Sequence, residues 1–410
     1  DGRYVKILLY ADDIVLFSNT SVGLQNHLDN LYDFCTKWKL TVNLSKTKVL
    51  VFRGGGPLSK DEFWYWGDQQ IDICSKYKYL GLYFSANGIT NQSLQHLADQ
   101  AGLAILSLKY RLKNIGDVPV KLSLKLFHQC VFPILLYGSQ VWGFRNCKII
   151  ERKCMQYFKS ILRVGMPTCN SAVYAELGEI PISIYAKYYM VKYFMKVRTS
   201  RDDRLDALLL EYLCDNIDRN VYGICNPAHE VRKILNEIGL SYIFDMDPAN
   251  ISKDTLGDIW LRMTDIAKTD IMAEICTFRK LSTYCEYKKD YNFESYLYVL
   301  KKNIYRQHIS KFRLVSHNLN VEMYRRTRNP SLIERCPCCH EDKLEDEFHF
   351  LLECKCYDFL RRIYIPDWDK SMYYFNNILS SENMNVLNNL GKLLYFAFKE
   401  RERILSSTPL

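Results

Sequence analysis

The chain has 410 residues, of which 48% are hydrophobic and 25% are charged. This composition is close to that of an average globular protein, which excludes a disordered tail, a collagen-like fibre and a coiled-coil rod, and the length suffices for two or three domains. Lys and Arg (55) outnumber Asp and Glu (46), and the formal net charge of +9 favours an anionic partner such as nucleic acid.

The N-terminal part of the sequence predicts short strands and one helix. Two β-rich apolar runs on either side of an Ala-Asp-Asp turn predict a hairpin over residues 4–18, with strands buried on both sides. Helical spacing then connects five apolar residues and predicts an amphipathic helix, through Leu24, Leu28, Leu31, Cys35 and Trp38. Further strands are predicted at 41–44, 47–52, 63–66 and 77–84.

After residue 88 the pattern becomes mostly helical. A first helix is predicted at 94–112, and Pro119 is expected to open a second one, because proline is tolerated at the first turn of a helix. Helices continue from about residue 148 to 319, with loops expected at 201–204 and 215–226. The sequence therefore predicts an α+β fold, with strands and helix mixed at the start and helices afterwards.

The hairpin turn carries two adjacent carboxylates, Asp12 and Asp13. Paired carboxylates on a tight turn offer a site for a hard cation such as Mg²⁺, and phosphoryl transfer commonly uses two such ions. A solvated hairpin turn is the alternative, since Asp is a common turn residue.

Four segments together resemble the reverse transcriptases of non-LTR (LINE-like) retrotransposons. The first is Tyr-Ala-Asp-Asp at 10–13, and the second is the Asn-x-x-Lys-Thr-Lys block that starts at Asn43. The third is Tyr-Lys-Tyr-Leu-Gly at 77–81, similar to the primer-grip block, and the fourth is the thumb segment at 133–138 with Trp142. The resemblance covers residues 1 to about 145 and thins out towards 190.

The resemblance implies roles for five residues. Asp12 and Asp13 would be the palm carboxylates that hold catalytic Mg²⁺, and Tyr10 would lie beside the primer terminus and the incoming nucleotide. Lys46 would lie near the triphosphate, where a lysine can neutralise or protonate departing pyrophosphate; a solvated turn lysine is the alternative. Gly81 would allow the primer strand to approach closely, and a plain turn glycine is its alternative.

The same resemblance implies the partners: an RNA template, a DNA primer or target, and deoxynucleoside triphosphates. Family polymerases need a third palm carboxylate and fingers upstream of Tyr-Ala-Asp-Asp, and only eleven residues precede Asp12 here. The chain, which begins with Asp1 rather than Met, is therefore expected to be a C-terminal fragment of this nucleotidyltransferase, inactive alone. The alternatives are a nucleic-acid-binding transposable-element remnant without catalysis and a group II intron maturase.

A Cys/His cluster near the C-terminus has the spacing of a zinc site. Four ligands are expected in the pattern C-x₂-C-x₉-H-x₄-C, namely Cys336, Cys339, His349 and Cys354. The stretch before Cys354 predicts a short helix, and Cys354 must lie at its end. Competing ligands are Cys338, His340 and Cys356, and reduced thiols without metal are the remaining alternative.

The block also resembles the C-terminal Cys-Cys-His-Cys element of some non-LTR retrotransposon proteins. Nearby arginines are expected to meet nucleic-acid phosphates, namely Arg325, Arg326, Arg328, Arg335, Arg361 and Arg362. The expected organisation is a partial palm of hairpin plus helix (1–86), a helical thumb (87–145), a helical C-terminal region (146–325), and a zinc-knuckle-like unit with a terminal helix (326–410).

Cysteine usage and apolar runs bear on location. Fifteen cysteines, mostly isolated and without a secretory signal, predict reduced thiols in an intracellular protein of the nucleus or cytoplasm. The apolar runs are too short for a membrane span. The oligomeric state is not indicated.

Overall fold

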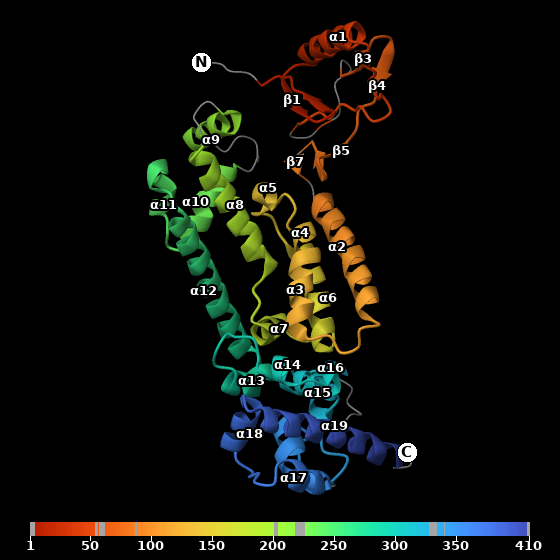
Figure 1. Cartoon of the computed structure of the whole chain (residues 1–410), viewed down its shortest axis with the longest axis vertical. Coiled ribbons are helices and arrows are strands. Elements are labelled where there is room, and N and C mark those ends of the chain that lie inside the picture. Colours follow the sequence, from red (N-terminus) through yellow and green to blue (C-terminus); the bar gives the residue numbers. More distant parts are fainter. Residues whose placement is uncertain are drawn as a thin grey trace. The chain divides into compact units, whose positions relative to one another are not determined.

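The computed structural model describes residues 5–53, 56, 62–86, 88–89, 91–200, 204–217, 226–327, 334–339 and 341–407. The chain divides into two compact units (Figure 1). The N-terminal unit consists mainly of residues 1–96, and the C-terminal unit consists of residues 97–218 and 226–410. The finer boundaries expected at 145 and 325 remain predictions.

The described residues of the N-terminal unit form three small antiparallel sheets and helix α1 (Ser21–Lys37), followed by the start of α2 (Asn91–Leu112). Its strands are β1 (Ile7–Tyr10), β2 (Asp13–Leu16), β3 (Trp64–Trp66), β4 (Gln69–Ile71), β5 (Lys76–Tyr79), β6 (Leu82–Ser85) and β7 (Gly88–Ile89). They pair as β1-β2, β3-β4 and β5-β6-β7. The predicted hairpin and the predicted strand at 63–66 are thus confirmed, and the strand predicted at 77–84 is two strands joined by a turn.

Helix α1 (Ser21–Lys37) confirms the predicted amphipathic helix. Thr20 directly precedes it, and the Thr20 hydroxyl accepts a hydrogen bond from the Gly23 amide at 3.0 Å and so caps the first turn. Its buried Leu28 joins Val49, Trp64 and Ile71 in the small core of this unit.

Two expectations for the N-terminal unit are wrong. The strands of the first hairpin are not buried on both sides, because a two-stranded sheet with one packed helix leaves Leu9 68% and Ile14 43% exposed. Residues 41–44 and 47–52 form no strand beyond one bridge from Val49 to Ile73. The Asn43 carbonyl instead accepts the Lys46 and Thr47 amides locally, and such local bonding competes with a sheet ladder.

From residue 91 onward, the described regular structure is helical apart from isolated β-bridges. The helices are α2 (Asn91–Leu112), α3 (Val120–Cys130), α4 (Phe132–Leu135), α5 (Ser139–Trp142), α6 (Lys148–Leu162), α7 (Asn170–Leu177), α8 (Ile182–Arg198), α9 (Leu205–Asp215), α10 (Pro227–Glu237), α11 (Tyr242–Asp245), α12 (Lys253–Thr277), α13 (Ser282–Tyr287), α14 (Tyr296–Val299), α15 (Asn303–Arg313), α16 (Asn320–Thr327), α17 (Asp358–Tyr364), α18 (Met372–Leu379) and α19 (Met384–Ser407). Single helical turns occur at Pro248–Asn250, Arg279–Leu281, His349–Glu353 and Lys355–Tyr357.

These elements confirm the α+β fold, the helix predicted at 94–112 and the position of Pro119, which directly precedes α3. Of the loops expected at 201–204 and 215–226, residues 201–203 and 218–225 lie outside the described part of the chain. None of the described helices is long and apolar enough to cross a lipid bilayer.

The thumb-like segment is anchored by a buried tryptophan. Trp142 is fully buried, and its indole N–H donates to the Tyr137 carbonyl at 2.9 Å. The following Gly143 lies against α8, where an added Cβ would stand 2.3 Å from the Ala186 carbonyl oxygen. Only glycine permits this approach of α5 to α8.

One pair of cysteines departs from the expectation of reduced thiols. Cys276 and Cys285 form a disulfide, because the turn at Arg279–Leu281 brings the end of α12 next to α13. Neither cysteine belongs to the C-terminal cluster.

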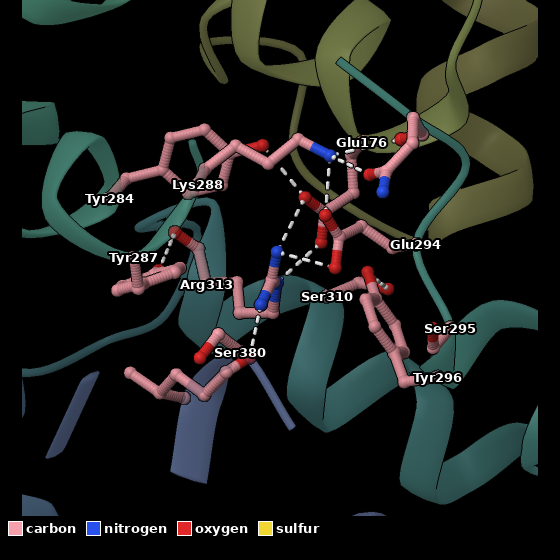
Figure 2. A network of polar contacts seen from close by, with 12 residues as sticks. Glu176, Tyr284, Tyr287, Lys288, Glu294, Ser295, Tyr296, Ser310, Arg313 and Ser380 are labelled. Atoms are coloured by element: carbon pink, nitrogen blue, oxygen red, sulfur yellow. Dashed lines mark hydrogen bonds and ion pairs between the residues drawn. The ribbon is translucent and has the colours of Figure 1, made fainter. Parts of the chain in front are cut away.

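A fully buried arginine organises the middle of the C-terminal unit (Figure 2). The Arg313 Nε donates to Glu176 at 2.7 Å, and another guanidinium nitrogen lies 2.9 Å from Glu294. Lys288 pairs with the other side of Glu294, and Tyr284 donates to Glu176 at 2.7 Å. Because two carboxylates and two cations balance, these buried charges are compensated.

Arg313→Met is expected to destabilise the protein by about 3–5 kcal/mol, because it leaves the buried Glu176 without its paired cation and leaves Glu294 with Lys288 alone. Denaturant unfolding of the purified chain measures this. The double variant Glu176→Gln/Arg313→Met should recover part of the loss, and a stability equal to that of the wild type in the single variant would contradict the prediction.

Another carboxyl, that of the half-buried Glu151 in α6, lies at the start of α8. Pro181 cannot cap α8 with its side chain, and the Glu151 carboxyl accepts the Ile182 and Ser183 amides instead. Its Oε1 has no other described partner. Burial is the largest influence and raises the pKa of Glu151 to about 7, although the two amides oppose this shift.

The free energy of unfolding is expected to fall by about 3 kcal/mol between about pH 5 and pH 8 because of the titration of Glu151. The pKa of Glu151 is raised in the folded state, so its contribution is complete below the unfolded pKa and is lost as the pH rises through about 7. Glu151→Gln should flatten this loss, as measured by urea unfolding across the pH range. If the free energy of unfolding depended on pH in the same way in the variant and the wild type, the prediction would be wrong.

Candidate metal centres

The turn of the first hairpin presents Asp12 and Asp13 to solvent. Tyr10 pairs with Asp13 across the hairpin, and Ala11 takes a left-handed φ of 54° to close the turn. Both carboxylates are exposed, and within the described residues neither has a hydrogen bond or ion pair from its side chain. The donor set therefore fits a hard cation such as Mg²⁺.

The fold brings three predicted blocks together around Tyr77 of β5. Its hydroxyl donates to the Lys46 carbonyl at 3.1 Å. Its pKa is raised, first by burial and then by the negative charge of Asp13. The backbone of the Lys46 block therefore contacts Tyr77, and the hairpin turn that carries Asp13 acts on the same ring electrostatically, although 33 positions separate Lys46 from Asp13 in sequence.

The other two predicted residues lie at the ends of strands. Tyr10 is 63% exposed at the end of β1. Gly81 has a φ of 83° in the turn from β5 to β6, next to Leu80 at 45°. The turn itself requires a left-handed residue, so the alternative role of Gly81 as a plain turn glycine already explains why glycine stands there. Its contact with a primer strand remains a prediction.

The second centre is the Cys/His cluster of the C-terminal unit. The ligand atoms of Cys336, Cys339, His349 and Cys354 all lie within 4.8 Å of one another. Cys336 Sγ and Cys354 Sγ are 3.8 Å apart, and Cys339 Sγ is 3.4 Å from His349 Nε2. A tetrahedral zinc ion with Zn–S bonds of about 2.3 Å separates its sulfur ligands by about 3.8 Å, so the spacing fits this metal.

Local structure holds each ligand in place. Cys354 directly follows the helical turn His349–Glu353, as the spacing requires, and its amide donates to the His349 carbonyl at 2.8 Å. His349 Nδ1 lies 3.3 Å from Glu353, which leaves Nε2 facing the cysteines. Such a carboxylate orients a ligating imidazole. Hydrogen bonds from Cys338 and Cys354 lower the pKa of Cys336 and so favour its thiolate.

The competing ligands are less suitable. Cys338 groups with Cys336 and Glu345, but both oxygens of Glu345 accept hydrogen bonds from Arg401 at 2.7 Å. Cys356 Sγ donates to the Cys338 carbonyl. His340 lies outside the described residues. The pairing of Arg401 with Glu345 was not predicted, because Arg401 lies far from the cluster in sequence and belongs to no motif.

The arginines around the cluster differ from the predicted basic face. Arg361 is fully buried and bonds to the Leu351 carbonyl and Asp358, so its role is structural. Arg326 pairs with Glu322, and Arg335 pairs with Asp342. Arg362 is exposed, and Arg328 lies outside the described residues. The expectation for Arg361 was wrong because the face of α17 that carries Arg361 packs inward against the Cys/His cluster.

One segment of the chain matches a known family. Residues 3–84 match the model of the family described as "Reverse transcriptase (RNA-dependent DNA polymerase)". This match, together with the relatives described below, supports a non-LTR retrotransposon reverse transcriptase as the origin of this segment. The matched residues contain Tyr10, Asp12, Asp13, Lys46 and Gly81.

Two relatives agree with this assignment. An uncharacterized transposon-derived protein of Caenorhabditis elegans is 32% identical over 156 residues, which are 37% of this chain and 53% of that protein. A Drosophila melanogaster protein named "Probable RNA-directed DNA polymerase from transposon BS" is 24% identical over 174 residues, 38% of this chain and 18% of that protein. The match therefore spans only part of each relative.

Proposed function

We propose that this protein takes part in RNA-directed DNA synthesis by a non-LTR retrotransposon, using an RNA template, a DNA primer and deoxynucleoside triphosphates. The observation that supports this most is the match of residues 3–84 to the reverse transcriptase family, because this segment presents Asp12 and Asp13 exposed on one turn and also contains Lys46. Carboxylates and a lysine are groups that phosphoryl transfer uses.

Each residue has a role in this proposal. Asp12 and Asp13 would hold Mg²⁺, which stabilises the charge on the attacking and leaving oxygens in phosphoryl transfer. Lys46 neutralises or protonates the departing pyrophosphate. Tyr10, exposed beside the carboxylates, contacts the primer end and the incoming nucleotide, and Gly81 lets the primer backbone approach.

We propose further that residues 1–410 alone do not polymerise. Among the described residues, the groups of three or more potential metal ligands include neither Asp12 nor Asp13. Two carboxylates on one turn do not fix two ions about 3.5–4 Å apart. The same observation favours a second candidate function, nucleic-acid binding without catalysis.

Primer extension on an RNA template with Mg²⁺ tests the proposal. The chain alone is expected to show no extension, whereas a chimera with the fingers and first palm half of a reverse transcriptase joined before residue 1 should extend the primer. Extension by the chain alone would overturn the proposed inactivity. A folded chimera that binds primer–template without extending it would favour the second candidate.

Binding of a primer–template duplex is expected to depend steeply on salt, because phosphate contacts release counterions. The net charge of +9 and exposed cations such as Arg362 motivate this expectation. Fluorescence anisotropy over a range of salt concentrations measures the slope. Affinity that does not change with salt, or no binding at low salt, would count against nucleic acid as the partner.

A further inference from the structure

A pocket of about 470 Å³ opens on the C-terminal unit between α8 and α12. These two helices pack against each other (Figure 1). Helix α8 lines it with Tyr189, Lys192, Tyr193 and Lys196, and the first turn of α12 adds Lys253. The α8 residues follow the spacing i, i+3, i+4, i+7, so one face of this helix forms the wall. The family match at 3–84 does not reach this region.

The charge around this pocket is uncompensated. Three lysines line it, and none of its lining residues is acidic. Within the part of the chain that the structure describes, no ion pair joins these three lysines to a carboxylate. Lys192 and Lys196 stand four residues apart on α8, where like charges destabilise a helix. An anion bound between them and Lys253 would remove that repulsion.

The two tyrosines add flat apolar surface to the charge. Tyr189 is 37% exposed and Tyr193 is 42% exposed on the same face as the lysines. Aromatic rings interleaved with lysines are the combination that binds unpaired nucleic acid, because bases stack on the rings while lysines contact the phosphates. A duplex keeps its bases stacked on one another and offers the rings no free face.

We propose that the pocket between α8 and α12 binds single-stranded nucleic acid, with bases stacked on Tyr189 and Tyr193 and phosphates held by the three lysines. The inference rests on the proposed function only in taking nucleic acid as the partner. It places a second nucleic-acid contact in the C-terminal unit, independent of Asp12 and Asp13.

Fluorescence anisotropy with the full chain and labelled oligonucleotides of about 12 nucleotides tests the proposal. The probes are an unstructured RNA strand, a DNA strand of the same sequence and the corresponding duplex. Lys192→Ala/Lys196→Ala is expected to weaken single-strand binding about tenfold or more and to lower the log–log salt slope by about 1.4. Duplex binding should change much less.

A control pair removes the same charge elsewhere. Lys233→Ala/Lys268→Ala takes two lysines from the surfaces of α10 and α12 outside the pocket, and it should leave single-strand binding near the wild-type value. Tyr193→Ala should weaken binding about fivefold or more, and Tyr193→Phe, which keeps the ring, should restore it. Thermal unfolding of each variant checks that the fold is intact.

Equal weakening by both lysine pairs, or unchanged binding in the pocket pair, would overturn the proposal. Equal loss of duplex and single-strand binding would overturn its single-strand specificity. Preference for RNA or for DNA supports the proposal and identifies the strand. The binding assay requires no polymerase activity, so failure of primer extension leaves this inference standing, and failure here leaves the polymerase proposal to its own test.

Discussion

Asp12→Ala is expected to abolish primer extension by the chimeric polymerase, with a loss of about a thousandfold or more. Asp12 is exposed on the turn and no described group pairs with its side chain, so its removal should leave the fold unchanged. Its proposed role is to hold a metal against the reacting phosphate, and electrostatic stabilisation of that kind exists only while the carboxylate is present. The assay is extension of a labelled primer on an RNA template.

Asp68→Ala is the matched control for this prediction. Asp68 is also exposed, and it lies in the turn of the β3-β4 hairpin of the same unit. Extension should survive in this variant. If Asp12→Ala extended the primer as fast as Asp68→Ala, the assignment of the turn as the catalytic metal site would be wrong.

One zinc ion per molecule is expected in the purified chain, and its removal by a chelator should unfold the Cys/His unit. Structural zinc sites contribute about 10–16 kcal/mol of binding free energy to folding. Three of the four candidate ligands are buried. Without the metal, their buried sulfur and nitrogen atoms lose the bonds to zinc that offset the cost of burying them. Metal analysis and limited proteolysis before and after chelation measure both effects.

Variants separate the two possible ligand sets. Cys339→Ser and His349→Ala should lose the metal, whereas Cys338→Ser and Cys356→Ser should keep one equivalent. Loss of zinc in Cys338→Ser with retention in Cys339→Ser would move the site to the group that contains Glu345. Equal zinc content in all four variants would rule out both sets.

Local sequence patterns correctly predicted the structural features that depend on neighbouring residues. The hairpin around Ala11-Asp12 follows from two β-rich runs and a turn, and α1 follows from its apolar stripe. The four candidate cysteine and histidine ligands could be chosen from spacing, because a metal ligand set is compact in sequence. Each of these features is decided by residues that are close together in the sequence.

Local sequence patterns gave wrong predictions where contacts with residues distant in sequence decide the structure. Residues 41–52 have strand composition, yet without partner strands the Asn43 carbonyl takes the nearby amides and a turn results. Arg361 has the composition of a surface cation but faces inward, because packing of α17 gives it the Leu351 carbonyl and Asp358 as partners.

The sequence by itself determined the family segment, the α+β fold class and the candidate ligands of the Cys/His cluster, since motif spacing and short-range periodicity carry that information. Only the tertiary structure decided that the Tyr77 hydroxyl bonds to the Lys46 carbonyl, that Arg313 compensates Glu176 across 137 positions, and that α8 and α12 form a basic, aromatic pocket. These arrangements depend on burial and charge compensation between distant segments, and neither quantity is defined until the chain has folded.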